Sequence, residues 1–155
     1  MDTVARTAEP GDAGVVARLL HDFDTEVDET DVPDVADFAV RFAVLLARDD
    51  VHVVLAEQGV EPVGFAYLTL RPTPYYDGSL GQLEELYVVP ALRDRGIGTL
   101  MLTTAIIDVR AKGAAEVHIN VDEVDVDTRR FYERHGFVNL QPGTDYRMLC
   151  YLREL

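Results

Sequence analysis

One stretch of the sequence strongly limits the fold. Residues 81–90 (GQLEELYVVP) read as an apolar strand that Pro90 ends, and a helical pattern runs from Gly98 to Lys112, where Gly113 closes it. A second strand-like stretch, EVHINV at 116–121, follows directly. A strand, a helix and another strand in this order predict a parallel crossover. The helix is expected to bury one side, made by Leu100, Met101, Thr104, Ile106 and Ile107.

The remaining pattern alternates strands and helices without a repeat or a linker. Strands are expected at 3–8, 51–57, 63–71 and 146–152, and helices at 11–23, 35–47 and 125–135, with Asp12 and Asp34 as N-caps of the first two. The strands at 51–57 and 63–71 read as an antiparallel hairpin. We therefore predict an α+β fold of sandwich type, in which a mixed, mostly antiparallel central sheet is flanked by helices. A length of 155 residues fits a single domain over 1–155.

Charge and composition exclude several classes of protein. The formal net charge of -14 opposes contact with nucleic acid, and no apolar run approaches a membrane span. Cys150 is the single cysteine, so no intrachain disulfide can form, and no cluster of His, Cys or Asp has metal-ligand spacing. A cytoplasmic protein without a metal is the expectation. Residues 21–37 carry eight acids and no Lys or Arg; this segment is either a solvated loop or an electrostatic funnel for a cationic ligand.

The turn RDRGIG (93–98) joins the strand that Pro90 ends to the helix after it. Glycines here would let backbone N–H groups of the first helical turn approach a ligand closely, and the helix dipole favours an anion. A dinucleotide fingerprint is a poor fit, because G-x-G-x-x-G needs a third glycine where this chain has Met101. The turn therefore predicts a phosphate or pyrophosphate site, unless the glycines serve only the turn.

Two motifs, in order, raise the specificity of this signal. Arg93, Gly96 and Gly98 match a pyrophosphate signature of Gln or Arg, two residues, Gly, one residue, then Gly or Ala. The sequence FYERHGF supplies Phe131, Tyr132, Gly136 and Phe137 of a second signature, in which Asp125 stands where Asn is common and Thr128 where Ala is common. With these motifs the chain resembles the GNAT superfamily of N-acetyltransferases, which use acetyl-CoA. The resemblance extends over most of the chain and implies the GNAT acyltransferase fold.

The resemblance assigns the cofactor contacts by position. The backbone of Leu86, Tyr87 and Val88 would hydrogen-bond the pantetheine arm, as a strand edge binds a peptide. The pyrophosphate would lie against the turn, at Arg93, Asp94, Arg95, Gly96, Ile97, Gly98 and Thr99. Asp125 is a weaker cofactor contact, because Asn is the common residue there.

Acetyl transfer to an amine needs a base, because a primary amine is mostly protonated at neutral pH. Glu84 is the first choice. Glu85 lies on the opposite strand face by simple alternation, and a bulge in the strand would be needed to exchange the two. His118 is a weaker candidate. Tyr132 matches the family's tyrosine that protonates the leaving thiolate, in addition to its packing beside Phe131.

The acceptor is inferred from the acidic segment. In the family this segment forms one wall of the acceptor cleft, which would bring some of Asp22, Asp24, Glu26, Asp28 and Glu29 near the amine, and Tyr75 and Tyr76 would supply an aromatic wall opposite. A small cationic amine is expected: a polyamine, an amino sugar or a basic amino acid. Acetylation of a protein lysine or N-terminus, a CoA-binding module without turnover and a structural domain stay open, as does a homodimer.

Overall fold

The computed structural model describes residues 2–27 and 30–155 and divides the chain into two compact units. The first unit ends at His118, and the second runs from Ile119 to Leu155. Each unit is described by itself. The single domain over 1–155 therefore stays a prediction.

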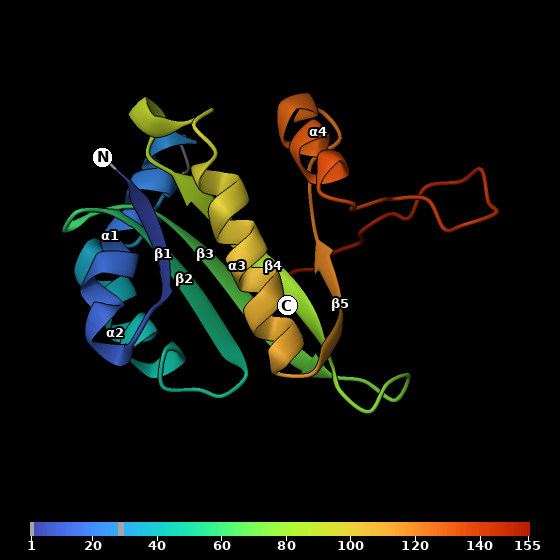
Figure 1. The fold of residues 1–155 in the computed structure, drawn as a ribbon, viewed down its shortest axis with the longest axis horizontal. Coiled ribbons are helices and arrows are strands. Elements are labelled where there is room, and N and C mark those ends of the chain that lie inside the picture. The colour runs from blue at the N-terminus through green and yellow to red at the C-terminus, as the bar shows by residue number, and fades with distance from the viewer. Residues whose placement is uncertain (1, 28–29) are drawn as a thin grey trace. The chain divides into compact units, whose positions relative to one another are not determined.

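The first unit is built on a five-stranded sheet with the order β1-β2-β3-β4-β5 (Figure 1). The strands are β1 (Thr3–Thr7), β2 (Val51–Gln58), β3 (Glu61–Pro72), β4 (Ser79–Val88) and β5 (Ala114–Ile119). Pairs β1–β2, β2–β3 and β3–β4 are antiparallel. The start of β4 lies beside the start of β5, since Ser79 N donates to Gly113 O at 3.2 Å and Gly81 lies against Val117. β4 and β5 thus run in the same direction, which confirms the predicted mixed, mostly antiparallel sheet.

Helices cover both faces of this sheet. α1 (Ala13–Glu26) and α2 (Val35–Leu45) pack on one face, where Phe38 and Phe42 join a core with Val53, Leu55 and Phe65. The alternate side chains of β2 and β3 point to the other face, which α3 (Ile97–Ala111) covers with Met101, Leu102, Ala105 and Val109 (Figure 1). The expected burial of Leu100 and Ile107 is wrong, since these residues are 36% and 60% exposed.

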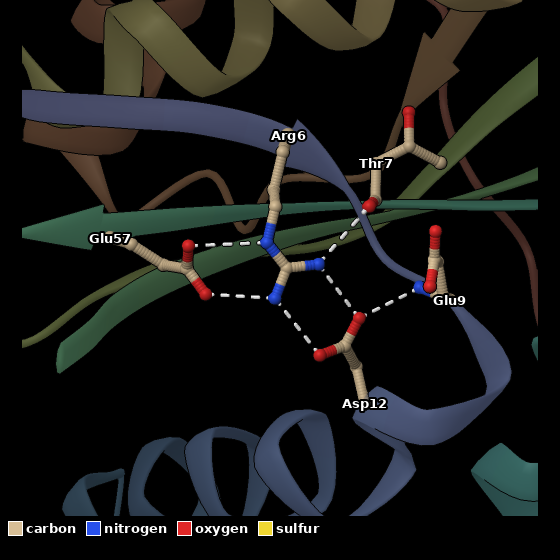
Figure 2. A network of polar contacts seen from close by, with 5 residues as sticks. All are labelled: Arg6, Thr7, Glu9, Asp12 and Glu57. Atoms are coloured by element: carbon tan, nitrogen blue, oxygen red, sulfur yellow. Dashed lines mark hydrogen bonds and ion pairs between the residues drawn. The ribbon is translucent and has the colours of Figure 1, made fainter. Parts of the chain in front are cut away.

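An arginine joins three elements at the edge of the sheet (Figure 2). Arg6 of β1 donates two hydrogen bonds to the Asp12 carboxylate, at 2.8 and 2.9 Å, and two to the Glu57 carboxylate of β2, at 3.1 and 2.8 Å. Asp12 also accepts from Glu9 N, and makes no side-chain cap bond to α1. The expected N-cap role of Asp12 is therefore replaced by a brace to Arg6, which holds the pKa of Asp12 below its ordinary value. Asp34 caps α2 as expected, by accepting from Asp37 N at 2.9 Å.

His52 is a buried histidine on β2, on the face that α3 covers. Its side chain is 3% exposed, and Nε2 lies 2.9 Å from Asp108 Oδ2 of α3. Within the described residues Nδ1 has no hydrogen-bond partner. Burial lowers the pKa of His52 from 6.5, against the opposing effect of Asp108. The folded protein therefore holds this ring in its neutral form.

This burial predicts a pH dependence of stability. Because the unfolded chain binds the proton more readily, the free energy of unfolding should fall as the pH drops below about 6.5, and level off below the folded pKa. Urea unfolding of wild type and His52→Leu between pH 7.5 and pH 5 measures this dependence. The free energy of unfolding should change less with pH in the variant. Equal slopes would mean that the ring titrates alike in both states.

The second unit carries one helix, α4 (Val126–Arg134), among its described residues 119–155. Asp125 is its N-cap and accepts from Thr128 N at 3.3 Å. The strand expected at 146–152 is wrong: this segment makes a single bridge, Leu140 with Arg147, and Leu149, Tyr151 and Leu152 are exposed. Alternating apolar residues favour a strand, but a strand forms only where a neighbouring strand pairs with it, and this unit provides none for 146–152.

Candidate active site

The turn between β4 and α3 has the backbone of an anion site. Asp94 has φ 60 and Gly96 has φ 81, two left-handed residues that bend the chain into the helix. The first helical hydrogen bond of α3 joins Leu100 N to Gly96 O at 2.9 Å, and no side chain caps the helix. The amides of Ile97 and Gly98 thus precede the first intrahelical bond, at the positive end of a 15-residue helix.

An open pocket of about 430 Å³ lies against this turn. A side chain built on Gly96 would meet nothing within 4 Å, so the backbone there faces open space. The walls of the pocket come from the β4–α3 turn, from the first turn of α3 and from the ends of β1 and β2: Asp2, Thr3, Gln58, Arg95, Gly96, Ile97 and Leu100. Among residues 2–27 and 30–155, the Arg95 guanidinium makes no ion pair with a carboxylate. The pocket therefore offers one unpaired cation beside the helix start.

Arg93 has a different environment from Arg95. Its guanidinium forms a two-pronged ion pair with Glu26 at the end of α1, with distances of 2.6 and 2.7 Å. Nε donates to the Val88 carbonyl at 3.0 Å, and the guanidinium carbon lies 5.7 Å from the centre of the Tyr87 ring. This pair lowers the pKa of Glu26. Arg93 and Glu26, expected in a cofactor site and an acceptor site respectively, are thus direct partners.

The end of β4 has one edge that β5 does not reach. β5 has six residues and starts beside Ser79, so its pairing ends near Glu84. Val89 N donates to Val63 O of β3, which turns the N–H and C=O of Val88, and by alternation those of Leu86, toward the other edge. Tyr87 points its own backbone to β3 and its side chain into the core, at 4% exposed.

A β-bulge in β4 changes the expected placement of the two glutamates. Tyr67 of β3 pairs with Glu85, and the next residue, Leu68, pairs with Leu83, so Glu84 is the extra residue. Thr69 Oγ1 donates to Glu84 Oε1 at 2.6 Å, on the same face as Tyr67. Glu84 and Glu85 therefore lie on one face, and the opposite-face placement of Glu85 is wrong. Burial and then the Glu84 carboxylate raise the pKa of Tyr67 beside them.

The residues expected around an acceptor differ in their surroundings. Asp22, Asp24 and Glu26 lie on α1, and Asp28 and Glu29 fall outside the described residues. Tyr75 is 82% exposed, and Tyr76 donates from its hydroxyl to Glu116 Oε2 at 2.8 Å. This carboxylate raises the pKa of Tyr76.

His118 is fully engaged and is a poor base. Its Nδ1 lies 3.2 Å from Arg71 Nη2, and Nε2 lies 2.5 Å from Glu116 Oε1. An arginine cannot accept a hydrogen bond, so Nδ1 of His118 is the acceptor, and the protonated Nε2 donates a hydrogen bond to Glu116. Neither nitrogen is available to an amine.

Comparison with known proteins joins these features to one family. The description "Acetyltransferase (GNAT) family" matches residues 16–137, which include the turn and α4. The chain belongs to the acetyltransferase (GNAT) family.

Two named relatives and one solved structure agree with this membership. The chain is 31% identical over 100 residues to the aminoalkylphosphonate N-acetyltransferase of Salmonella typhimurium, covering 64% of this chain and 65% of that one. It is 37% identical over 68 residues to an aminoglycoside N(6')-acetyltransferase type 1 of Klebsiella aerogenes, covering 43% of this chain and 44% of that one. The match thus spans less than two thirds of either relative. A crystal structure of a proposed acetyltransferase from Arthrobacter sp. FB24 has a TM-score of 0.91 at 45% identity, covering 98% of this chain and 96% of that one.

The family and the named relatives are acetyltransferases, which agrees with the enzyme class that the sequence predicts. The family's tyrosine, Tyr132, lies on α4 in the second unit, and its ring is 5.2 Å from that of Phe131 and 5.5 Å from that of Phe137. Its role in catalysis stays a prediction. Within residues 2–27 and 30–155, no helix could cross a membrane and no group of His, Cys, Asp or Glu could hold a metal ion.

The sequence did not indicate Thr69, which is the hydrogen-bond partner of Glu84 in this candidate site. Thr69 fixes one oxygen of Glu84, yet a lone threonine in a strand carries no functional pattern. Its position could be found only from the register of β3 against β4.

Proposed function

We propose that this protein transfers an acetyl group from acetyl-CoA to the primary amine of a small molecule. The observation that carries the proposal is the left-handed turn at Asp94 and Gly96, which leads into an uncapped helix start beside a pocket with an unpaired arginine. Such a turn suits the pyrophosphate of a CoA molecule. Family membership supplies the reaction class.

The residues fit this cofactor. Gly96 leaves space where any side chain would intrude, the amides at 97 and 98 can donate to phosphate oxygens, and Arg95 adds a positive charge. The outward N–H and C=O of Leu86 and the outward N–H of Val88 can pair with the amide groups of the pantetheine arm, as in strand addition, whereas the Val88 carbonyl already accepts from Arg93 Nε. Bound there, acetyl-CoA supplies an activated acetyl group as a thioester. Asp125, the N-cap of α4, is a weaker contact, as its side chain already accepts from Thr128 N.

Glu84 is the proposed base. Its Oε1 accepts from Thr69, which fixes the carboxylate and leaves Oε2 for the ammonium of an acceptor. By taking a proton from the ammonium, Glu84 would make the amine lone pair available for attack on the acetyl carbon. Glu85, on the same face, adds a second negative charge. Tyr132 is the proposed donor of a proton to the departing sulfur.

The acceptor is proposed to be cationic: a polyamine, an amino sugar or a basic amino acid. Glu84, Glu85 and the acids at the end of α1 lie in the first unit, within a chain of net charge -14, and attract cations to this surface. The two relatives named above acetylate small amines according to their names, which supports a small molecule over a protein acceptor. A cytoplasmic location and a homodimer stay predictions of the sequence.

The test measures thiol release from acetyl-CoA with cationic, neutral and anionic amines at low and high salt. Cationic acceptors should have the highest kcat/KM and lose part of it at high salt through screening. Asp24→Asn should reduce this preference. The control Glu61→Gln removes one charge at the β2–β3 hairpin and should not. Thiol release with no amine in the panel, despite CoA binding, would indicate a binding module instead.

A further inference from the structure

A cluster of four polar residues lies on the same sheet face as Glu84 and has no part in the chemistry above. It comes from three segments: Arg71 at the end of β3, Tyr76 in the β3–β4 loop, and Glu116 and His118 on β5. Tyr76 donates to one oxygen of Glu116, His118 donates to the other, and Arg71 donates to His118. The chain of bonds ends at the Arg71 guanidinium.

Arg71 has no direct ion pair among the described residues, although its charge helps to lower the pKa of the nearby Glu116 carboxylate, after the larger effects of His118 and Tyr76. Both oxygens of Glu116, the nearest acid in the chain of bonds, are occupied by Tyr76 and His118. Among the described residues, the Arg71 guanidinium donates to the unprotonated ring nitrogen of His118, and no carboxylate forms an ion pair with Arg71. In a chain with 28 acidic and 14 basic residues, an oriented arginine whose guanidinium makes no direct ion pair with a described carboxylate is a candidate site for an external anion.

Arg71 is also close to the proposed base. Thr69 and Arg71 are two positions apart on β3, so their side chains share a face about 7 Å apart along the strand. Thr69 is the residue that donates to Glu84. The Glu84 carboxylate of β4, which is held by Thr69, and the Arg71 guanidinium of β3 thus lie on one face of two paired strands. This order of charges is complementary to a molecule with an ammonium at one end and an acid a few bonds away.

We propose that Arg71, oriented by His118, binds an anionic group of the acceptor, so that the substrate is a cationic amine that also carries a carboxylate. The proposal rests on the function proposed above and narrows it. Among the three kinds of cationic acceptor named above, a basic amino acid meets both charges, whereas a simple polyamine brings no anionic group to Arg71.

The experiment compares acceptors that differ only in the acid: lysine with cadaverine, and ornithine with putrescine. Thiol release from acetyl-CoA gives kcat and KM for each, with wild type and Arg71→Gln. The acid-bearing member of at least one pair should be preferred by wild type. Arg71→Gln should reduce its kcat/KM by about 10-fold to 100-fold, mainly through KM, because a charge-assisted hydrogen bond is lost. The amine without the acid should change less than about 2-fold, since it never contacts Arg71.

Two further variants control this result. Arg18→Gln removes the same charge from an exposed position on α1 and should leave both members of each pair unchanged. Arg71→Lys keeps the charge but loses the two-pronged donor, and should restore only part of the preference. Equal rates for both members of each pair, with Arg71→Gln affecting neither, would overturn the anion site and leave the acetyltransferase intact. Absence of transfer to these four amines, together with transfer to another amine of the panel above, would overturn the anion site alone, and absence of transfer to every amine would overturn both proposals.

Discussion

Gly98→Val should abolish the stabilisation of this protein by CoA while leaving it folded. A ligand that binds only the folded state stabilises it by about 2.7 kcal/mol at 100 times its Kd, which for a chain of this size is a shift of roughly 5–10 °C in Tm. Gly98 is the second residue of α3, and a branched side chain there would project beside the first amides of the helix. Thermal unfolding with and without CoA measures the loss.

The chain contains a matched control for this variant. Gly14 is the second residue of α1, and a side chain there would also meet nothing within 4 Å. Gly14→Val makes the same change at the same helical position, at a distance from the turn between β4 and α3, and should keep the full CoA shift. A Gly98→Val protein that still shifts with CoA would remove the basis for the cofactor site.

Glu84→Gln should lower kcat/KM for the amine by about 10²-fold to 10³-fold, because the glutamine keeps the shape of the side chain but cannot take a proton. Tyr132→Phe should lower kcat and leave CoA affinity unchanged, since it removes one hydroxyl proton. Steady-state kinetics between pH 6 and pH 9 test both.

Glu85→Gln is the control for the base, as it removes the same charge from the same face. We expect a small effect, since the pairing of Glu85 with Tyr67 places it within the regular ladder, whereas Glu84 is the extra residue of the bulge. A large loss of kcat/KM in Glu85→Gln, with no loss in Glu84→Gln, would show that Glu85 is the base and Glu84 is not.

The sequence predicted the order of elements well, because strong local signals mark their ends. Pro90 and Gly113 end β4 and α3 within two residues of the expected positions, and Asp34 caps α2 as expected. The buried side of α3 could not be predicted, because apolar residues surround most of that helix and Ile107 is exposed. The strand expected at 146–152 failed because pairing depends on a neighbour that no local pattern specifies.

The motifs of the candidate site could be predicted from the sequence, but the contacts between its residues could not. The spacing of Arg93, Gly96 and Gly98 indicates an anion site from sequence alone. The bulge at Glu84 depends on how β3 and β4 align, and alternation along one strand cannot detect an extra residue. The ion pair of Arg93 with Glu26 joins residues 67 positions apart, which only the folded chain brings together.

That ion pair links two surfaces that would otherwise respond separately. Glu26 ends α1, at the border of the acidic segment, and Arg93 begins the turn where a polyanion would bind. A phosphate that draws on Arg93 competes with Glu26, and a cation that draws on Glu26 competes with Arg93. A ligand at either surface therefore weakens the Arg93–Glu26 ion pair and frees the charged residue of the other surface. The two ligands should favour each other's binding, with equal coupling in both directions.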